Sequence, residues 1–245
     1  MAEQLLHFPV LPCPSATWEL TTLALDGDLS HPHFKTMLSG VLQSLERLEL
    51  MPLTNLRSPN QSWEHLLDDV HFPRLSTLHV REDISLHFLL SFLARHPRIS
   101  VVHITGTSLK VPSDPAGRFD LHSLSAISGP PSYALAILRS ALNAVSLTRL
   151  TLQTHHLPNS SIFHEVLQCL TRCHTLETLE ISMPFGGMGF LVGDDLVPPE
   201  IAFLNIKTFR IILDDVCSDV EDGDIIVSIS ILRLTYQTQM SARLH

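Results

Sequence analysis

The sequence predicts an α/β solenoid, with a parallel sheet of strands on one face and helices on the other. Three observations predict this fold. A short motif occurs nine times. It consists of an apolar residue, any two residues, an apolar residue, any one residue and a last apolar residue, and each copy is called a phrase below. The copies start 22 to 30 residues apart. Segments with helical spacing of apolar residues stand between most copies, so strand-period and helix-period segments alternate.

The nine phrases predict nine short strands. Within each phrase the last two apolar residues point to one face of a strand, because side chains alternate along it. The first apolar residue closes the turn before the strand. The copies are Leu20-Leu23-Leu25, Leu45-Leu48-Leu50, Leu75-Leu78-Val80, Ile99-Val102-Ile104, Leu121-Leu124-Ala126, Leu147-Leu150-Leu152, Leu176-Leu179-Ile181, Ile206-Phe209-Ile211 and Ile229-Leu232-Leu234, the last within a strand predicted over Ile229–Tyr236.

Helical spacing precedes five of the phrases, namely the second, third, fourth, sixth and seventh. Each helix would return the chain and cover the core side of the strands. One unit cannot bury its apolar face alone, so units must stack, and a phrase of this kind at this period is typical of a leucine-rich-repeat solenoid. The helical residues are Phe34, Leu38, Val41, Leu42, Trp63, Leu66, Leu67, Val70, Leu86, Leu89, Leu90, Leu93, Ala134, Ile137, Leu138, Ala141, Leu142, Ile162, Val166, Leu167 and Leu170.

The repeats predict one continuous domain rather than several compact ones. Residues 19–236 form a leucine-rich-repeat domain of about nine irregular repeats, because each repeat of a solenoid contacts only its neighbours. Residues 1–18 are expected to form an N-terminal segment that caps the first repeat. Residues 237–245 are a polar tail in which we see no capping helix.

Charge and composition narrow the class of partner. The chain has 25 acidic and 16 basic residues, a formal charge of −9. Binders of nucleic acid or anionic membranes are normally basic, so we expect neither as a partner. No apolar stretch reaches the length of a membrane span, and the N-terminus lacks the basic region of a signal peptide. Four cysteines without a spaced framework indicate a reducing compartment, hence a cytoplasmic or nuclear location.

The strand face opposite the core is the predicted binding surface. The third and fifth positions of each phrase point there, and they carry polar and charged side chains; in the fifth phrase they are Ser123 and Ser125. Such a mixture suits a protein target held by many modest contacts, and the alternative is a solvated face without a partner. The predicted partner-binding residues are Arg47, Glu49, Thr77, His79, His103, Arg149, Thr151, Glu180, Arg210 and Arg233.

Two groups of histidine and cysteine residues are candidates for a metal site. His79 and His103 share one position in adjacent repeats, so their rings would lie close enough to bind a metal or sense pH. No third ligand matches them, and a coincidental pair is the favoured interpretation. Cys169, Cys173 and His174 also fall short of a zinc site, and cysteines at helical core spacing are usually small buried hydrophobes. We therefore expect no metal and no cofactor.

Two further segments are best explained as loops. The acidic run over residues 214–224 lacks the glycine frame of a calcium-binding EF-hand loop, so we expect a solvated loop. The glycine-rich stretch over residues 185–190 lacks the lysine and the strand–turn–helix context of a phosphate-binding loop. We expect a surface loop there, with a contact role as the alternative.

Signatures of enzymes are absent from the sequence. There is no Gly-x-Ser-x-Gly elbow, no Cys-x-x-Cys pair and no Walker phrase. We therefore predict a non-enzymatic protein. The competing class is a hydrolase in an ordinary α/β fold, which would require Ser, His and Asp or a metal cluster to converge in a pocket.

Three stretches of the chain resemble the repeat regions of fungal F-box and leucine-rich-repeat proteins. They read FPRLSTLHV, LARHPRIS and LTRCHTLETLEIS. In that family a helix ends at a short turn of "CP" or "HP" type before the Leu-x-x-Leu-x-Leu strand. Arg95-His96-Pro97 and Arg172-Cys173-His174 occupy that turn here. The resemblance runs from about Trp18 to Leu234.

The resemblance implies the substrate-recognition part of an SCF-type ubiquitin ligase. In such proteins an F-box docks a Skp-type adaptor and through it a cullin, while the repeats hold the target. Here the repeats begin by Leu20, and Leu11-Pro12-Cys13-Pro14 is not the opening phrase of an F-box. Either the F-box is missing from this sequence, or the protein is a repeat-only relative. A free-standing scaffold or inhibitor of one protein, and a truncated non-functional fragment, are the alternatives.

Overall fold

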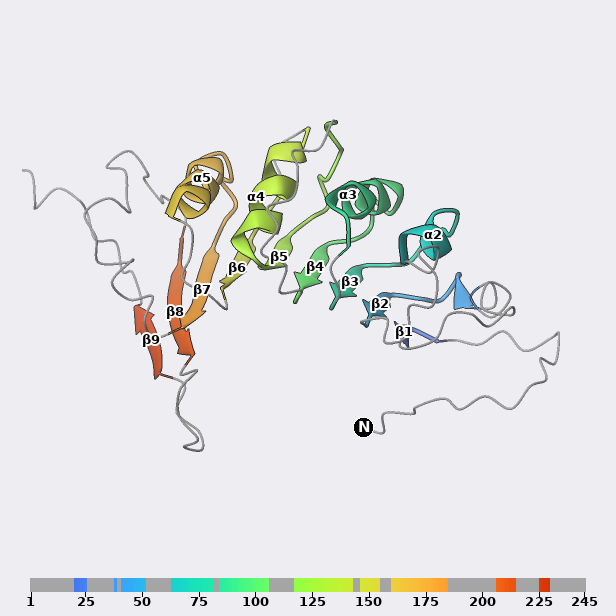
Figure 1. Ribbon diagram of the computed structural model, residues 1–245, viewed down its shortest axis with the longest axis horizontal. Coiled ribbons are helices and arrows are strands. Elements are labelled where there is room, and N and C mark those ends of the chain that lie inside the picture. The colour runs from blue at the N-terminus through green and yellow to red at the C-terminus, as the bar shows by residue number, and fades with distance from the viewer. Residues whose placement is uncertain are drawn as a thin grey trace, which may run out of the picture.

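The structure is an α/β arrangement in two layers. In the computed structural model a sheet lines the concave, lower side of the molecule in Figure 1, and helices cover the convex, upper side. This architecture is compatible with a solenoid. The residues that the structure describes are 20–25, 38, 41–51, 63–81, 84–105, 117–142, 146–154, 160–184, 206–214 and 225–229.

The strands follow one another through the sheet in chain order. Those from β1 to β8 pair in parallel, so the chain must return to the same end of the sheet before each new strand begins. Each return therefore adds one strand beside the last. The strands are β1 (Thr22–Leu25), β2 (Arg47–Leu50), β3 (Thr77–Val80), β4 (Val101–Ile104), β5 (Ala126–Gly129), β6 (Arg149–Gln153), β7 (Thr178–Pro184), β8 (Thr208–Asp214) and β9 (Ile225–Ile229).

Helices form the returns before the third, fourth, sixth and seventh phrases, as their spacing predicted. They are α2 (Trp63–Leu67), α3 (Leu86–Arg95), α4 (Pro131–Ser140) and α5 (Ser160–Leu170). Helix α3 begins after Ser85, whose Oγ accepts a hydrogen bond from the Phe88 amide at 3.2 Å. Helix α4 begins at a proline, which is suited to the first helical turn because its missing N–H would have no partner there.

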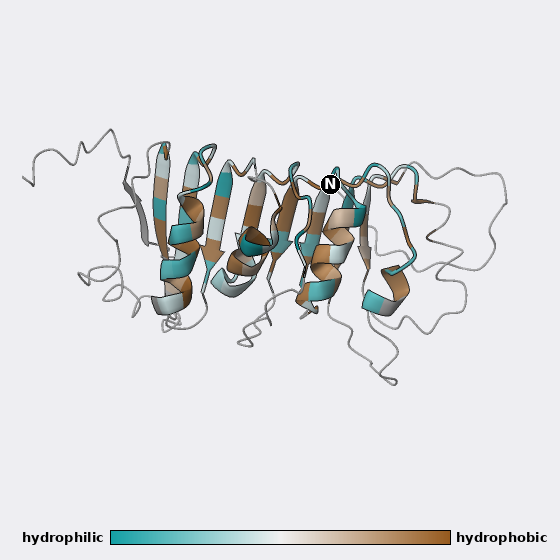
Figure 2. Cartoon of the chain, turned by 90° about the horizontal axis from the view of Figure 1, so that it is seen from above, coloured by the Kyte–Doolittle hydropathy of each residue, from teal (hydrophilic) through white to brown (hydrophobic). Residues whose placement is uncertain are grey.

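The hydrophobic core lies between the two layers. In the second, third, fourth, sixth and seventh phrases the last two apolar residues are at most 2 % exposed. Helical residues such as Leu89, Ile137 and Val166 are fully buried against them. In Figure 2 the helices carry separate hydrophobic and hydrophilic residues, as expected for elements with one face on the core.

The turn after α3 is closed by a buried histidine. His96 is 2 % exposed, and its Nδ1 lies 2.7 Å from the Phe92 carbonyl, to which it must donate. Its ring also packs on the ring of Phe92 at 4.1 Å and stacks with His71 at 5.1 Å. Burial lowers the pKa of His96 to about 4, so the ring is neutral at pH 7.

Hydroxyl groups link successive turns in front of the strands. The Oγ of Ser76 donates to the Glu46 carbonyl at 3.1 Å, and Ser100 donates to the Ser76 carbonyl at 3.4 Å. Ser125 continues the series to Ser100 at 3.0 Å, and Thr148 donates to Ser125 at 3.1 Å. This ladder joins the same position of five consecutive repeats and helps to fix their register.

The fifth repeat differs from the predicted frame by three residues. Ile127 pairs with Val102 on one side and with Leu150 on the other, so the core phrase is Leu124-Ile127-Gly129. The third and fifth positions are therefore Ala126 and Ser128, and the assignment of Ser123 and Ser125 to the outer face was wrong. The cause is Gly129, which fills a core position where a Cβ would lie 2.8 Å from the carbonyl oxygen of Ile104. Glycine is not counted as an apolar residue in the phrase, so the hydrophobic pattern does not reveal this frame.

The last strand also differs from the prediction. Strand β9 runs antiparallel to β8, with Phe209 opposite Ile229 and Leu213 opposite Ile225. The sequence pattern predicts no strand over most of these residues. The strand expected over Ile229–Tyr236 lies outside the described residues apart from Ile229, so its direction stays a prediction.

Several predicted segments lie outside the described residues. They are the N-terminal segment 1–18, the glycine-rich loop 185–190, the acidic run beyond Asp214 and the tail 237–245. Within the described part of the chain, no helix combines the length and the hydrophobicity needed to cross a bilayer.

Candidate interaction face

Two columns of outward side chains cross the concave side of the sheet. Parallel pairing in register places the same phrase position of each repeat beside its neighbour, and the described helices lie on the opposite side of the sheet (Figure 1). The fifth-position column is Ala24, Glu49, His79, His103, Ser128, Thr151, Glu180 and Arg210. The third-position column is Thr22, Arg47, Thr77, Val101, Ala126, Arg149, Thr178 and Thr208.

Ion pairs occupy two places on this face. The Oε1 atom of Glu49 lies 2.6 Å from Nη2 of Arg81 and 3.3 Å from Nδ1 of His79. Farther along the sheet, Arg210 Nη1 lies 3.8 Å from Glu180 Oε2. Glu49 is only 14 % exposed, so its carboxylate is better shielded from water than an ordinary surface acid.

The two histidines meet at the middle of the face. Their rings lie 5.7 Å apart in an edge-on arrangement, as their adjacent positions predicted. Both ring nitrogens of His79 are buried and have no hydrogen-bond partner among the described residues, since the contact with Glu49 lacks the required alignment.

Burial is the main cause that lowers the pKa of both histidines. For His79 the nearby Glu49 carboxylate opposes the shift, while Arg81, His103 and Arg47 add to it. For His103 the guanidinium groups of Arg47 and Arg149 add to the effect of burial. Both rings are therefore neutral at pH 7.

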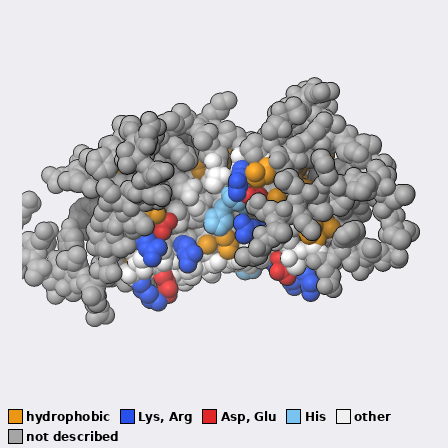
Figure 3. Space-filling model, turned by 90° about the horizontal axis from the view of Figure 1, so that it is seen from below, with side chains coloured by type: hydrophobic (Ala, Val, Ile, Leu, Met, Phe, Trp, Pro, Cys, Tyr) orange, Lys and Arg blue, Asp and Glu red, His pale blue; other side chains and the backbone are white. Residues whose placement is uncertain are grey.

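Two arginines flank the histidines without a carboxylate partner among the described residues. Arg47 on β2 and Arg149 on β6 are both exposed. His103 on β4 lies two strands from each of them. Figure 3 shows histidine side chains at the middle of this face, with basic side chains on both sides.

The structure brings most of the predicted site residues together. Arg47, Glu49, His79, His103 and Arg149 gather around the middle of the sheet. The other members lie in the same columns: Thr77 and Thr151 beside the central group, Glu180 and Arg210 towards β8. Arg233 lies outside the described residues. Their role in binding a partner stays a prediction.

Sequence reasoning missed three residues of this face. Arg81 comes directly after β3, at the seventh position of its phrase. Alternation along an extended chain places this position on the same side as the third and fifth, which was the available signal. Ala126 and Ser128 were missed because of the shifted frame of the fifth repeat.

The cysteine cluster has the properties of core residues. Cys173 is buried and its Sγ lies 3.9 Å from the Cys169 carbonyl, while Cys169 is half-buried. Burial raises the pKa of the Cys173 thiol to about 11 and also raises the pKa of Cys169. Both are protonated at pH 7, a poor state for metal binding. Among the described residues, no group of three or more His, Cys, Asp or Glu side chains is placed to hold a metal.

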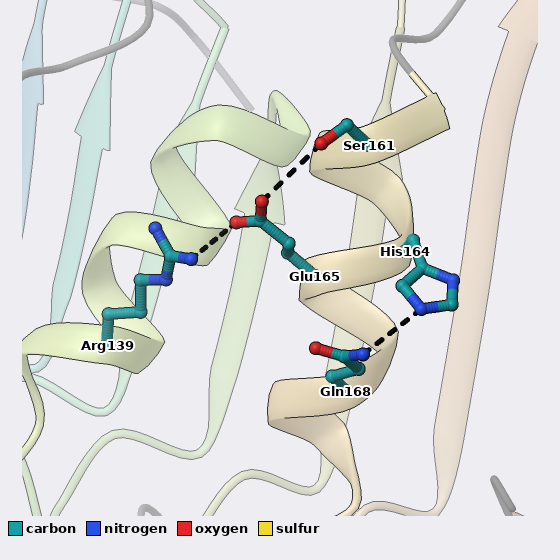
Figure 4. A network of polar contacts seen from close by, with 5 residues as sticks. All are labelled: Arg139, Ser161, His164, Glu165 and Gln168. Atoms are coloured by element: carbon teal, nitrogen blue, oxygen red, sulfur yellow. Dashed lines mark hydrogen bonds and ion pairs between the residues drawn. The ribbon is translucent and has the colours of Figure 1, made fainter. Parts of the chain in front are cut away.

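A polar network lies on the helical layer, away from the concave face (Figure 4). Nη2 of Arg139 on α4 lies 2.5 Å from Oε2 of Glu165 on α5, and Ser161 donates to the other carboxylate oxygen at 3.5 Å. His164 and Gln168 form a separate pair on α5 at 3.1 Å. The Arg139–Glu165 contact joins the two helices, while the other two contacts lie within α5. Together they account for these polar residues as parts of the outer helical layer.

Comparison with known proteins finds no matching family model, no matching curated protein and no matching solved structure. The function must therefore be inferred from the concave face itself. Its columns offer charged and hydroxyl-bearing side chains in a regular array.

Proposed function

We propose that this chain is a leucine-rich-repeat protein without enzymatic activity, which binds a protein partner through the concave face of its sheet. The observation that carries the proposal is the pair of in-register polar columns across β1 to β8, on the side opposite the described helices. Extended concave surfaces of this kind are the usual binding surfaces of solenoids. Many modest polar contacts spread over such a surface can hold a folded partner.

The repeat assignment has support at three levels. The core phrase recurs at 22 to 30 residues, and the strands from β1 to β8 follow chain order and pair in parallel. The hydroxyl ladder then joins equivalent turn positions of neighbouring repeats. Each feature is expected when one unit is repeated along a coil.

The resemblance to fungal F-box proteins suggests a more specific role. We propose that the repeats hold the target of an SCF-type ubiquitin ligase, in the cytoplasm or nucleus. A Skp-type adaptor and a cullin would then join through an F-box. No cofactor or metal enters this proposal.

A tagged pull-down from native-host lysate, identified by mass spectrometry, tests both parts of the proposal. The first variant is Thr151→Glu, which places a longer, negatively charged side chain in the fifth-position column of β6. The matched control is Gln168→Glu, at an exposed position of α5 on the helical layer. The tag is added to the gene in its native host, so that any F-box encoded upstream is kept. We expect the wild-type protein and the control to recover a Skp-type adaptor, a cullin and a third protein. The Thr151→Glu variant should lose the third protein and keep the adaptor.

Other outcomes separate the two parts. A concave-face partner recovered without adaptor or cullin would support the binding module and contradict the ligase role. A partner that survives Thr151→Glu and is lost with Gln168→Glu would contradict the choice of face. A wild-type protein that recovers no other protein would contradict the proposal as a whole.

A further inference from the structure

We propose that the middle of the concave face binds an acidic segment of the protein partner, with Arg47 and Arg149 as its anchors and the histidine pair between them. This inference rests on the proposed function, because it names the chemistry of the partner that this face would take.

The geometry places the two arginines around one point. Both occupy the third position of their phrases, on β2 and β6, and His103 lies midway on β4. Adjacent strands are about 4.8 Å apart, so each arginine starts about 10 Å to one side of His103. Both guanidinium groups come near enough to contribute to the lowered pKa of His103. The two arginines therefore flank the histidine pair on opposite sides, as the basic side chains in Figure 3 do.

The charges at this point are unbalanced. The acid in the central group, Glu49, is already paired with Arg81. Arg47 and Arg149 have no carboxylate partner among the described residues, and both histidines are neutral. Among the described residues that face the concave side between β2 and β6, three guanidinium groups stand against one carboxylate, on a chain whose formal charge is −9. A local positive region on an acidic protein favours a negatively charged partner segment.

The floor between the arginines leaves room for such a segment. It is formed by short side chains, Thr77, Val101, Ala126, Ser128 and Thr151, with the histidine rings among them. None of these carries a negative charge that would repel a carboxylate. Guanidinium groups bind carboxylates through two parallel hydrogen bonds, which gives such contacts both strength and direction.

The spacing sets the length of the segment. Arg47 and Arg149 are four strand intervals apart, or about 19 Å at the backbone. An extended peptide covers about 3.3 Å per residue, so about six residues reach from one arginine to the other. We therefore expect a short extended stretch with several Asp or Glu residues.

Fluorescence anisotropy of a labelled hexaglutamate peptide tests this inference on the full chain. The variants are Arg47→Gln, Arg149→Gln and the double change, and the matched control is Arg172→Gln, an exposed arginine in the turn after α5. We expect wild type and control to bind alike, each single variant to bind about tenfold more weakly, and the double variant about a hundredfold. Hexaglutamine should not bind, and raising the salt from about 50 to about 200 mM should weaken hexaglutamate binding.

Each opposing result overturns the inference. The proposed site is contradicted if the wild-type chain does not bind hexaglutamate, or if the double variant binds it as tightly as the wild-type chain does. Tighter binding to oligothymidylate than to hexaglutamate would indicate a nucleic acid instead. A wild-type dimer in analytical ultracentrifugation that the double variant abolishes would make a second copy of this chain the occupant.

The same measurements distinguish this inference from the proposed function. A partner captured through the concave face, yet indifferent to both arginine changes and to salt, would keep the proposed function and overturn the acidic segment. Arginine-dependent binding of hexaglutamate with no protein recovered from lysate would support the site and contradict the proposed function. Circular dichroism melts establish that all variants are folded, which we expect because both arginines are exposed.

Discussion

At the scale of single residues, His96 shows how the turn after α3 depends on a neutral side chain. The ring is buried, donates to the Phe92 carbonyl and packs between aromatic neighbours. Charging it would place a cation in this apolar setting, which is why its pKa falls to about 4. The free energy of unfolding therefore depends on pH through this one residue.

We predict that folding stability falls as the pH drops from 6.5 towards 4. In this window the unfolded chain, whose histidine pKa is about 6.5, binds a proton that folded His96 does not. The free energy of unfolding should be about 2 kcal/mol lower at pH 5 than at neutral pH through this group alone. Urea unfolding of wild type and of His96→Gln at about pH 7.5 and about pH 5 measures it. The variant should lose about 2 kcal/mol less, and an equal loss in both proteins would refute the assignment.

At the scale of elements, the fifth repeat shows why a backbone position can outweigh a hydrophobic pattern. Strand β5 ends at Gly129, whose φ is 155° and whose missing Cβ makes room for the carbonyl of Ile104 on the neighbouring strand β4. The hydrophobic pattern favours Leu121-Leu124-Ala126 as the core phrase, because those residues are apolar. The pairing instead follows the close approach of two backbones, which hydrophobicity does not report.

We predict that Gly129→Ala destabilises the protein by roughly 1–3 kcal/mol. The added Cβ would lie 2.8 Å from the Ile104 carbonyl oxygen and 3.0 Å from the Ile104 Cβ, so one of the two strands must shift. Gly117→Ala is the control, because its Cβ would meet only the Phe119 ring at 3.7 Å, an ordinary contact. Chemical denaturation measures the midpoints of both variants, and we expect a lower midpoint for Gly129→Ala. Equal midpoints would show that β4 and β5 do not approach closely at Gly129.

At the scale of the whole molecule, most of the α/β architecture could be predicted from the sequence. Aliphatic residues at the core positions of β2, β3, β4, β6 and β7 report burial directly, and four of the predicted helices are present. The proximity of His79 and His103 also followed from their equal positions and is confirmed.

Other features could not be found in the same way, because they depend on neighbours that stacking brings together. The Ser76–Ser100–Ser125 ladder joins residues 24 or 25 positions apart, and serine carries no hydrophobic signal. The engagement of Glu49 by Arg81 depends on the side-by-side placement of β2 and β3. The antiparallel direction of β9 likewise follows from pairing rather than from its apolar composition.

The strands show one division of side chains, between apolar ones that enter the core and polar ones that face the concave side. Arg149 and Leu150 are neighbours on β6 and lie on opposite sides of this division. Leu150 is fully buried, and Arg149 is exposed. A negative charge at position 150 would be buried without a partner, whereas one at position 149 would remain in water.

The measurement that tests this division most directly is a pair of thermal melts, with unfolding free energies from urea denaturation. Leu150→Asp should lose more than about 4 kcal/mol or fail to fold, while Arg149→Asp should stay within about 0.5 kcal/mol of wild type. Equal damage by the two changes would contradict the assignment of faces, and with it the proposed binding surface.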